Sequence, residues 1–192
     1  MPTQPVPSPT PTPGAPSGAF DAPLIRDFMA GSVGNVFKVM LSMDAVSVDL
    51  PHDAATLEGI GKPVKIPHDR IVGSIGFNGE ATGNVFLHFE LPFASACTCH
   101  LLGMSESELA EAGNECLNDA IAEITNMTAG GFKNALCDRG FPCMLTLPSV
   151  LRGSSFYVAP VSSAARHVSH FDCGGHRVTA EIFIKSNDPE TS

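Results

Sequence analysis

One stretch, Ser105 to Gly140, constrains the fold of this chain more than any other, because its whole length has the pattern of a single helix. Ser105 and Glu108 form a capping box, in which each side chain accepts a backbone N–H that the first turn leaves unpaired. Gly140 followed by Pro142 is a stop signal, since glycine takes the left-handed cap and proline cannot continue the helix. At about 1.5 Å per residue the helix would be roughly 50 Å long.

The predicted helix has two different sides. Helical spacing gathers apolar and small residues on one broad side, which we expect to pack on the core: Leu117, Ala120, Ile121, Ile124, Met127, Thr128, Gly131 and Ala135. Asp119, Glu123, Asn126 and Gly130 form a line on the opposite side, at spacings of four, three and four residues. Gly130 would let a partner approach the backbone closely. From spacing alone, a solvated helix face is the simpler interpretation of this line.

The ends of the chain differ in composition from the middle. Residues 1–20 contain seven prolines, so we expect a disordered tail with a tendency to polyproline II structure. Residues 21–187 are predicted to form one domain, followed by a short C-terminal tail at 188–192.

Other secondary-structure signals within this domain alternate between helix and strand. We expect a first helix from Pro23 to Met43, capped by Asp21, and a short helix from Pro92 to Leu102. Residues 52–69 have the composition of a long loop. Seven segments are predicted to be strands, the last two joined by a Gly174-Gly175 turn: Ala45–Leu50, Arg70–Phe77 with Ala81–Glu90 as a hairpin, Cys143–Leu151, Ser155–Val161, Arg166–Cys173 and His176–Lys185.

A weak internal repeat relates the two halves of the domain. Phe37-Lys38 in the first half corresponds to Phe132-Lys133 in the second, each near the end of a helix that precedes a strand and a hairpin. The sequence therefore predicts an α+β fold with two long helices packed on one antiparallel sheet of about six strands. In this alignment Phe28 and Gly31 take the places of Glu123 and Asn126, so we expect one site per chain.

Charge and hydropathy exclude several classes of function. The net charge of -9 and the lack of a basic cluster argue against binding to nucleic acid, whose phosphates need lysine and arginine side chains. No apolar run reaches the length needed to cross a membrane, and no secretory signal is apparent. We therefore expect a cytoplasmic protein that contacts neither nucleic acid nor membrane.

Cysteine and histidine residues offer weak metal-site candidates. The six cysteines lie in core-like segments, so we expect free thiols. Cys97, Cys99 and His100 do not have the usual zinc spacing, although a thiol or metal sensor there is an alternative. His167, His170, Cys173 and His176 recur every third residue, but side chains three apart on a strand point to opposite faces. We expect this chain to bind no metal or other cofactor.

Two parts of the sequence resemble a known family. Asp119, Glu123 and Asn126, followed by Met127-x-Ala129-Gly130-x-x-Lys133, are similar to the signature of the CheC/CheX/FliY family of chemotaxis phosphatases. The segments Val72 to Phe77 and Gly83 to Leu87 resemble the glycine-bearing hairpin that precedes the motif helix in that family. The resemblance covers roughly residues 24–186, and the single motif copy is closest to CheX. Gly131 departs from the family, which often has asparagine there.

The resemblance implies hydrolysis of the aspartyl phosphate on a CheY-like response regulator. Asn126 would orient the attacking water, and Glu123 would pair with a lysine of the regulator. Asp119 would support Glu123 or contact the partner. Mg²⁺ would belong to the regulator, not to this chain.

The same resemblance leaves an alternative function open, namely a non-catalytic module that binds and sequesters a regulator through the same face. The resemblance also implies a homodimer: CheX-like proteins form homodimers through their sheets, and the segment Val178 to Lys185 could pair with its own copy as an edge strand. Edge strands are also commonly protected by charge, so the sequence leaves the dimer open.

Overall fold

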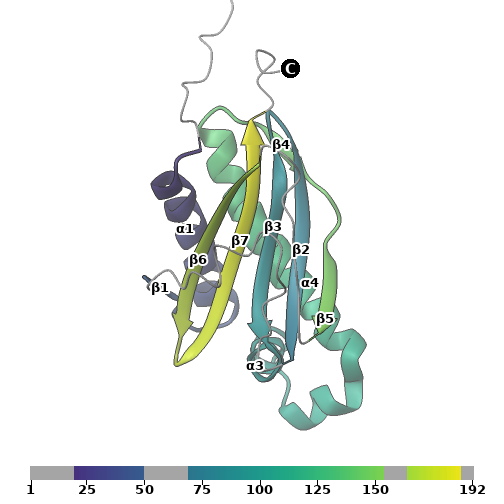
Figure 1. Ribbon diagram of the computed structural model, residues 1–192. Coiled ribbons are helices and arrows are strands. Elements are labelled where there is room, and N and C mark those ends of the chain that lie inside the picture. The colour runs from purple at the N-terminus through teal and green to yellow at the C-terminus, as the bar shows by residue number, and fades with distance from the viewer. Residues whose placement is uncertain (1–19, 50–68, 154–163, 187–192) are drawn as a thin grey trace, which may run out of the picture.

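The computed structural model describes residues 20–49, 69–153 and 164–186. The elements are, in chain order, α1 (Ala22–Met40), β1 (Val46–Val48), β2 (Arg70–Gly79), β3 (Ala81–Glu90), α3 (Leu91–Leu102), α4 (Glu106–Asp138), β4 (Cys143–Leu145), β5 (Ser149–Gly153), β6 (Ala165–Cys173) and β7 (His176–Ser186). Figure 1 shows α1 and α4 on one face of the sheet, with α3 at one end. The predicted α+β class is confirmed.

The sheet has seven antiparallel strands, one more than the approximate number predicted, and its order reflects the internal repeat. Strands follow the order β1-β6-β7-β3-β2-β4, and β5 also pairs with β2. The two hairpins, β2–β3 and β6–β7, meet in the middle through β3 and β7. The outer strands of each half pair with the hairpin of the other half: β1 pairs with β6, and β4 and β5 pair with β2. The repeated units are thus interleaved in one sheet.

The core lies between this sheet and the helices. On β3, alternate side chains face α4 and α1 and are fully buried: Val85, Leu87 and Phe89. The facing positions of β7 are apolar as well, with Val178, Ala180, Ile182 and Ile184 buried. Both central strands therefore present a continuous apolar surface on which the helices pack.

The capping signals of α4 are confirmed. The backbone N–H of Ser105 donates to Glu108 Oε2 at 2.7 Å, and the Glu108 N–H donates to Ser105 Oγ at 3.3 Å. The hydrogen bonds from Ser105 hold the pKa of the Glu108 carboxyl below its usual range. At the other end, Gly140 takes a φ of 90°, as its cap position requires.

The prediction that Ser105 to Gly140 forms one continuous helix is wrong. Gly113 has φ 78° and ψ -167°, so the helix breaks there and changes direction. Only a residue without a β-carbon adopts this conformation readily, and the helical pattern on both sides conceals the break. The continuous part after Gly113 is about 37 Å long at 1.5 Å per residue.

Other boundaries differ by smaller amounts. The first helix ends at Met40 and not at Met43. The strand predicted over 143–151 is two strands, because three residues (146–148) lie opposite only two residues of β2, Ile75 and Gly76. Thr146 still exchanges hydrogen bonds with Gly76 at the start of this break. Val178 to Lys185, expected at an edge, lies inside the sheet between β6 and β3. The predicted strand 155–161, nearly all of loop 52–69 and most of both tails lie outside the described residues.

Candidate functional site

The side chains of the predicted site lie on the solvent side of α4. Asp119 and Glu123 are exposed, and Asn126 and Gly130 are partly exposed, while Ile124 and Thr125 between them are buried. The side chains of Asp119, Glu123 and Asn126 make no hydrogen bond or ion pair with any other part of the chain that the structure describes. The site is therefore an open polar surface whose acceptors and donors are free to contact a partner.

Close contact with β2 fixes the height of this part of α4 above the sheet. A β-carbon at Gly73 would overlap the side chain of Thr125, the residue before Asn126. Thr125 is fully buried, and its hydroxyl donates to the carbonyl of Ile121 at 2.7 Å. The glycine in the hairpin segment Val72 to Phe77 thus has a structural role: it lets the helix that carries Asn126 pack directly on the backbone of the sheet.

A second close contact joins α4 to α1. A β-carbon at Gly131 would lie 2.9 Å from Ser32 Oγ, and that hydroxyl already donates to the Phe28 carbonyl at 2.8 Å. A larger side chain at this position, such as asparagine, would require Ser32 to move. Gly130, in contrast, has open space around it, as expected for a position that faces outward.

The start of the continuous part of α4 is tied to the edge of the sheet by Arg152 on β5. Its Nη1 donates to Asn114 Oδ1 at 2.6 Å, and its Nε donates to Asn118 Oδ1 at 2.8 Å. Asn114 directly follows the break at Gly113. These bonds hold the helix at the point where it changes direction, one turn or more before Glu123.

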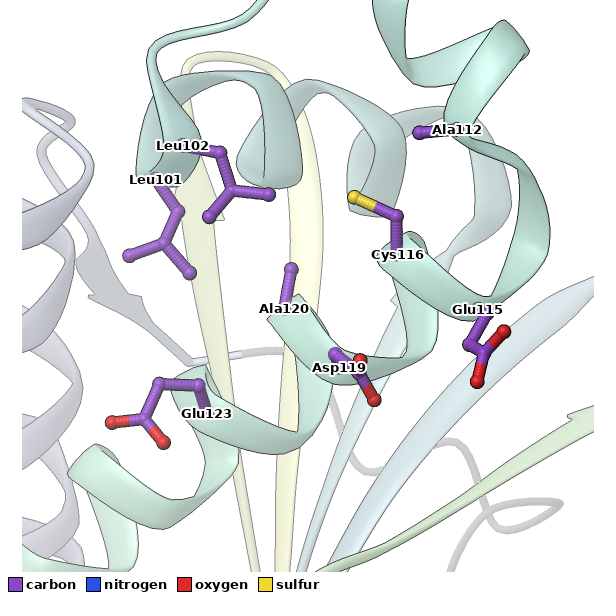
Figure 2. Close-up of a pocket in the computed structure, with 8 residues that line it drawn as sticks. All are labelled: Leu101, Leu102, Ala112, Glu115, Cys116, Asp119, Ala120 and Glu123. Carbon is purple, nitrogen blue, oxygen red and sulfur yellow. The ribbon is translucent and has the colours of Figure 1, made fainter.

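A groove lies beside the predicted site, between the end of α3 and α4 (the α3–α4 groove, about 700 Å³). Figure 2 shows two leucines of α3 on one side and α4 on the other. Its lining residues are Leu101, Leu102, Ala112, Glu115, Cys116, Asp119, Ala120 and Glu123. Sequence reasoning found Asp119 and Glu123 but missed the groove, because the break at Gly113 brings Ala112 to its wall.

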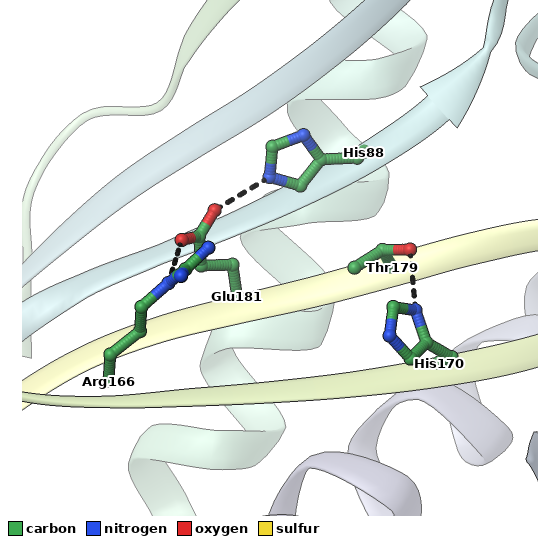
Figure 3. Close-up of polar contacts among 5 residues, drawn as sticks. All are labelled: His88, Arg166, His170, Thr179 and Glu181. Carbon is green, nitrogen blue, oxygen red and sulfur yellow. Dashed lines mark hydrogen bonds and ion pairs between the residues drawn. The ribbon is translucent and has the colours of Figure 1, made fainter. Parts of the chain in front are cut away.

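A polar cluster on the opposite face of the sheet was also missed. Glu181 is 6% exposed and accepts hydrogen bonds from Arg166 Nε at 2.6 Å and His88 Nε2 at 3.2 Å (Figure 3). Burial alone would raise the pKa of the Glu181 carboxyl, but the His88 hydrogen bond and the Arg166 charge hold it below its usual value. These residues come from three strands, so no local sequence pattern joins them.

The histidine and cysteine candidates do not converge. His170 bonds Thr179 on the face shown in Figure 3, whereas His167 lies opposite Ile182 on the helix side. Within residues 20–49, 69–153 and 164–186, no three His, Cys, Asp or Glu side chains are grouped as metal ligands would be.

All six cysteines are free thiols. Burial raises the pKa of Cys97 to about 12, and burial also raises that of Cys99. These two thiols stay protonated near neutral pH, unlike the thiolate of a redox sensor.

None of the described helices is long and apolar enough to cross a membrane.

Solved structures with this fold come from several bacteria. CheX of Vibrio vulnificus is 23% identical with a TM-score of 0.66, over 84% of this chain and 96% of that one. A CheC-like superfamily protein of Shewanella sp. PV-4 is 23% identical with a TM-score of 0.65, over 85% and 98%. CheX of Borrelia burgdorferi, solved with CheY, BeF3 and Mg²⁺, is 17% identical with a TM-score of 0.60, over 83% and 97%. At these identities the likeness establishes the fold.

Sequence comparison adds the family. No curated protein matches this sequence significantly. The family model described as chemotaxis phosphatase CheX matches residues 71–172, more than half of the 192-residue chain, and this range contains both the glycine hairpin and the Asp119 to Lys133 segment. The protein therefore belongs to the CheX family of chemotaxis phosphatases.

Proposed function

We propose that this protein hydrolyses the aspartyl phosphate of a CheY-like response regulator. One observation carries the proposal: Glu123 and Asn126, three residues apart on α4, face solvent without partners in the described part of the chain. Family membership and the CheY complex of the Borrelia burgdorferi relative support the choice of substrate. A cytoplasmic location agrees with such a substrate and is part of the proposal.

Such a site needs few groups because an acyl phosphate is already reactive. Phosphoryl transfer depends mainly on positioning and on stabilisation of charge. In the proposed mechanism the Asn126 amide hydrogen-bonds a water and holds it in line with the phosphorus, which supplies the orientation that bulk water lacks. Glu123 pairs with a lysine of the regulator and fixes the docking register. Mg²⁺ would be held by the acidic pocket of the regulator.

The packing of α4 supports this assignment. Thr125, next to Asn126, is locked against Gly73, and the following turn is held to α1 through Gly131. A helix fixed on two sides keeps its exposed side chains at a constant height, as a water-positioning amide requires. Asp119, one turn before Glu123, extends the acidic surface toward the partner.

Loss of phosphate from an acetyl-phosphate-charged regulator tests the proposal. We expect Asn126→Ala to lower kcat by about 100-fold or more, the usual effect of removing one positioned hydrogen-bonding group. Glu123→Ala should lower kcat/KM strongly. Asn134→Ala is the matched control, because this exposed amide lies on the same helix two turns beyond Asn126. Wild-type rates in both Asn126→Ala and Glu123→Ala would show the assigned roles to be wrong.

The competing function is a module that sequesters the regulator without turnover. The partner-free amide at Asn126 favours the phosphatase, since sequestration requires no group that positions water. Substoichiometric protein distinguishes the two: an enzyme releases many equivalents of phosphate, whereas a sequestering module protects the phosphoryl group.

A homodimer is also part of the proposal. Because β7 is paired on both sides, a dimer would have to use a surface other than the edge that we expected. Sedimentation equilibrium of the full chain measures the assembly state directly.

A further inference from the structure

The α3–α4 groove combines an apolar wall with small side chains opposite. Leu102, at the end of α3, is a large apolar side chain that is nevertheless 50% exposed, and the neighbouring Leu101 is partly exposed. Across the groove α4 contributes Ala112, Cys116 and Ala120 (Figure 2). Small residues on one side and leucines on the other leave room for an apolar side chain from outside.

The other rim of the groove is a straight row of carboxylates. Glu115, Asp119 and Glu123 are four residues apart, so they follow one another along α4. None of the described lining residues is basic. The whole stretch from residue 71 to residue 132 contains eight acidic residues and no lysine or arginine, and six of the eight fall between Glu106 and Glu123. The charge around the groove complements a basic partner.

Continuity with the proposed catalytic face decides what occupies the groove. Glu123 lines the groove and is also the residue that we assign to the regulator's lysine. A regulator docked on Glu123 and Asn126 therefore covers the mouth of the groove. The row from Glu123 back to Glu115 spans about two helical turns, roughly 12 Å, which is within the reach of one segment of the same partner.

We infer that the α3–α4 groove is a second docking site for the response regulator and sets partner choice. It takes an apolar side chain between Leu102 and Ala120, flanked by lysine or arginine side chains that pair with Glu115 and Asp119. The occupant is a regulator segment beside the phosphorylated aspartate. This inference rests on the proposed function, because it takes the regulator as the partner.

Binding of a BeF3-loaded, Mg²⁺-containing CheY-like regulator that the wild-type protein dephosphorylates provides the test, read as Kd by calorimetry. We expect Leu102→Gln and Glu115→Lys each to raise Kd about 10-fold, since apolar burial and local charge both contribute to docking. Wild-type binding should also weaken as salt rises, and Glu115→Lys should reduce that dependence.

Two matched variants separate local effects from general ones. Leu147→Gln removes a leucine that is 88% exposed on the link between β4 and β5. Glu80→Lys makes the same charge change as Glu115→Lys, but at the β2–β3 turn beside Pro142, beyond the other end of α4. Both should leave Kd within about twofold of the wild-type value, because neither position borders the groove.

The outcomes are distinct. Wild-type affinity in Leu102→Gln and Glu115→Lys, or an equal loss in Glu80→Lys, would overturn the docking site. A change of assembly state in Leu102→Gln would show that a second copy of the chain occupies the groove. Asn126→Ala separates the two proposals: if it keeps full turnover while the groove variants bind weakly, the catalytic assignment fails and the docking site stands. If Asn126→Ala loses turnover while the groove variants bind normally, the docking site fails and the catalytic assignment stands.

Discussion

The helices α1 and α4 occupy related positions on the same face of the sheet, yet they present different surfaces at the repeat-related positions. On α4, Glu123 and Asn126 face solvent without partners in the described part of the chain. On α1, Phe28 packs against the ring of Phe132 with centroids 6.4 Å apart, and the Arg139 guanidinium lies 5.8 Å above the Phe28 ring. The same scaffold position serves packing in one half and is free for recognition in the other.

The comparison implies that position alone does not make a site. The Phe28 position lies beside Arg139, whereas no lysine or arginine occurs between residues 71 and 132. A carboxylate placed at residue 28 would pair with Arg139 and would not be available to a lysine of the partner. The α3–α4 groove is lined by residues of α3 and α4, and no residue of α1 is among them. The half that carries Glu123 and Asn126 therefore differs from its counterpart in local charge and in shape as well as in these two side chains.

A transplant between the helices tests this conclusion and has the largest expected effect. We expect Phe28→Glu with Gly31→Asn, added to Asn126→Ala, to leave kcat at the Asn126→Ala level, about 100-fold or more below wild type. Single-turnover loss of phosphate from a charged regulator measures it, and thermal unfolding checks that the variant is folded. Recovery of turnover to within a few-fold of wild type would show that the acid and amide suffice at either position.

Alanine substitutions at two glycines, one on β2 and one on α1, should have a smaller effect, which is on the free energy of unfolding. Gly73→Ala should lower the free energy of unfolding by about 1–3 kcal/mol, because the new β-carbon overlaps the buried Thr125 side chain and forces the helix or strand to move. Gly31→Ala in α1 is the control. Nothing lies within 4 Å of its β-carbon position, so alanine there should stabilise the helix by about 0.5–1 kcal/mol. Urea unfolding distinguishes these opposite signs, and equal effects would contradict the packing role of Gly73.

Local signals in the sequence predicted most elements of the fold. Asp21 and Ser105 begin the two long helices as expected, and Gly174 and Gly175 take the positive φ values that a tight hairpin needs. These predictions succeeded because caps and turns depend on a few adjacent residues. The site residues Asp119, Glu123 and Asn126 share one side of a helix, so spacing placed them together. Their proposed roles came from family resemblance, because spacing alone favours a solvated face.

The features that sequence reasoning missed depend on contacts between distant segments. Gly113 lies inside an apparently continuous helical pattern, and only its φ of 78° shows the break. Val178 to Lys185 has the alternation of an edge strand, but pairing with β3 places it inside the sheet. Leu102 becomes part of a groove only because α4 turns back beside it after Gly113. Periodicity describes one element at a time and carries no information about such neighbours.

The smallest predicted effect concerns His167, which lies on the part of the sheet beneath α1, whereas Gly73 lies on β2 beneath α4. Burial lowers the pKa of His167 below its ordinary 6.5, with Asp21 acting in the opposite direction, and its Nε2 is buried without a partner among the described residues. Because the unfolded chain then binds more protons than the folded one, the free energy of unfolding should decrease as pH falls from about 6.5 toward the folded-state pKa.

His167→Leu should flatten this decrease without lowering stability at pH 8, since a buried unpaired nitrogen contributes nothing that leucine loses. Glu181 gives no comparable slope in that window, because its pKa lies below the usual carboxyl range and its contribution is lost only at more acidic pH. Urea unfolding of wild type and His167→Leu at pH 8, 6.5 and 5.5 measures the difference. If the free energy of unfolding falls with pH equally in the two proteins, the pH sensitivity arises outside the half of the sheet that supports α1.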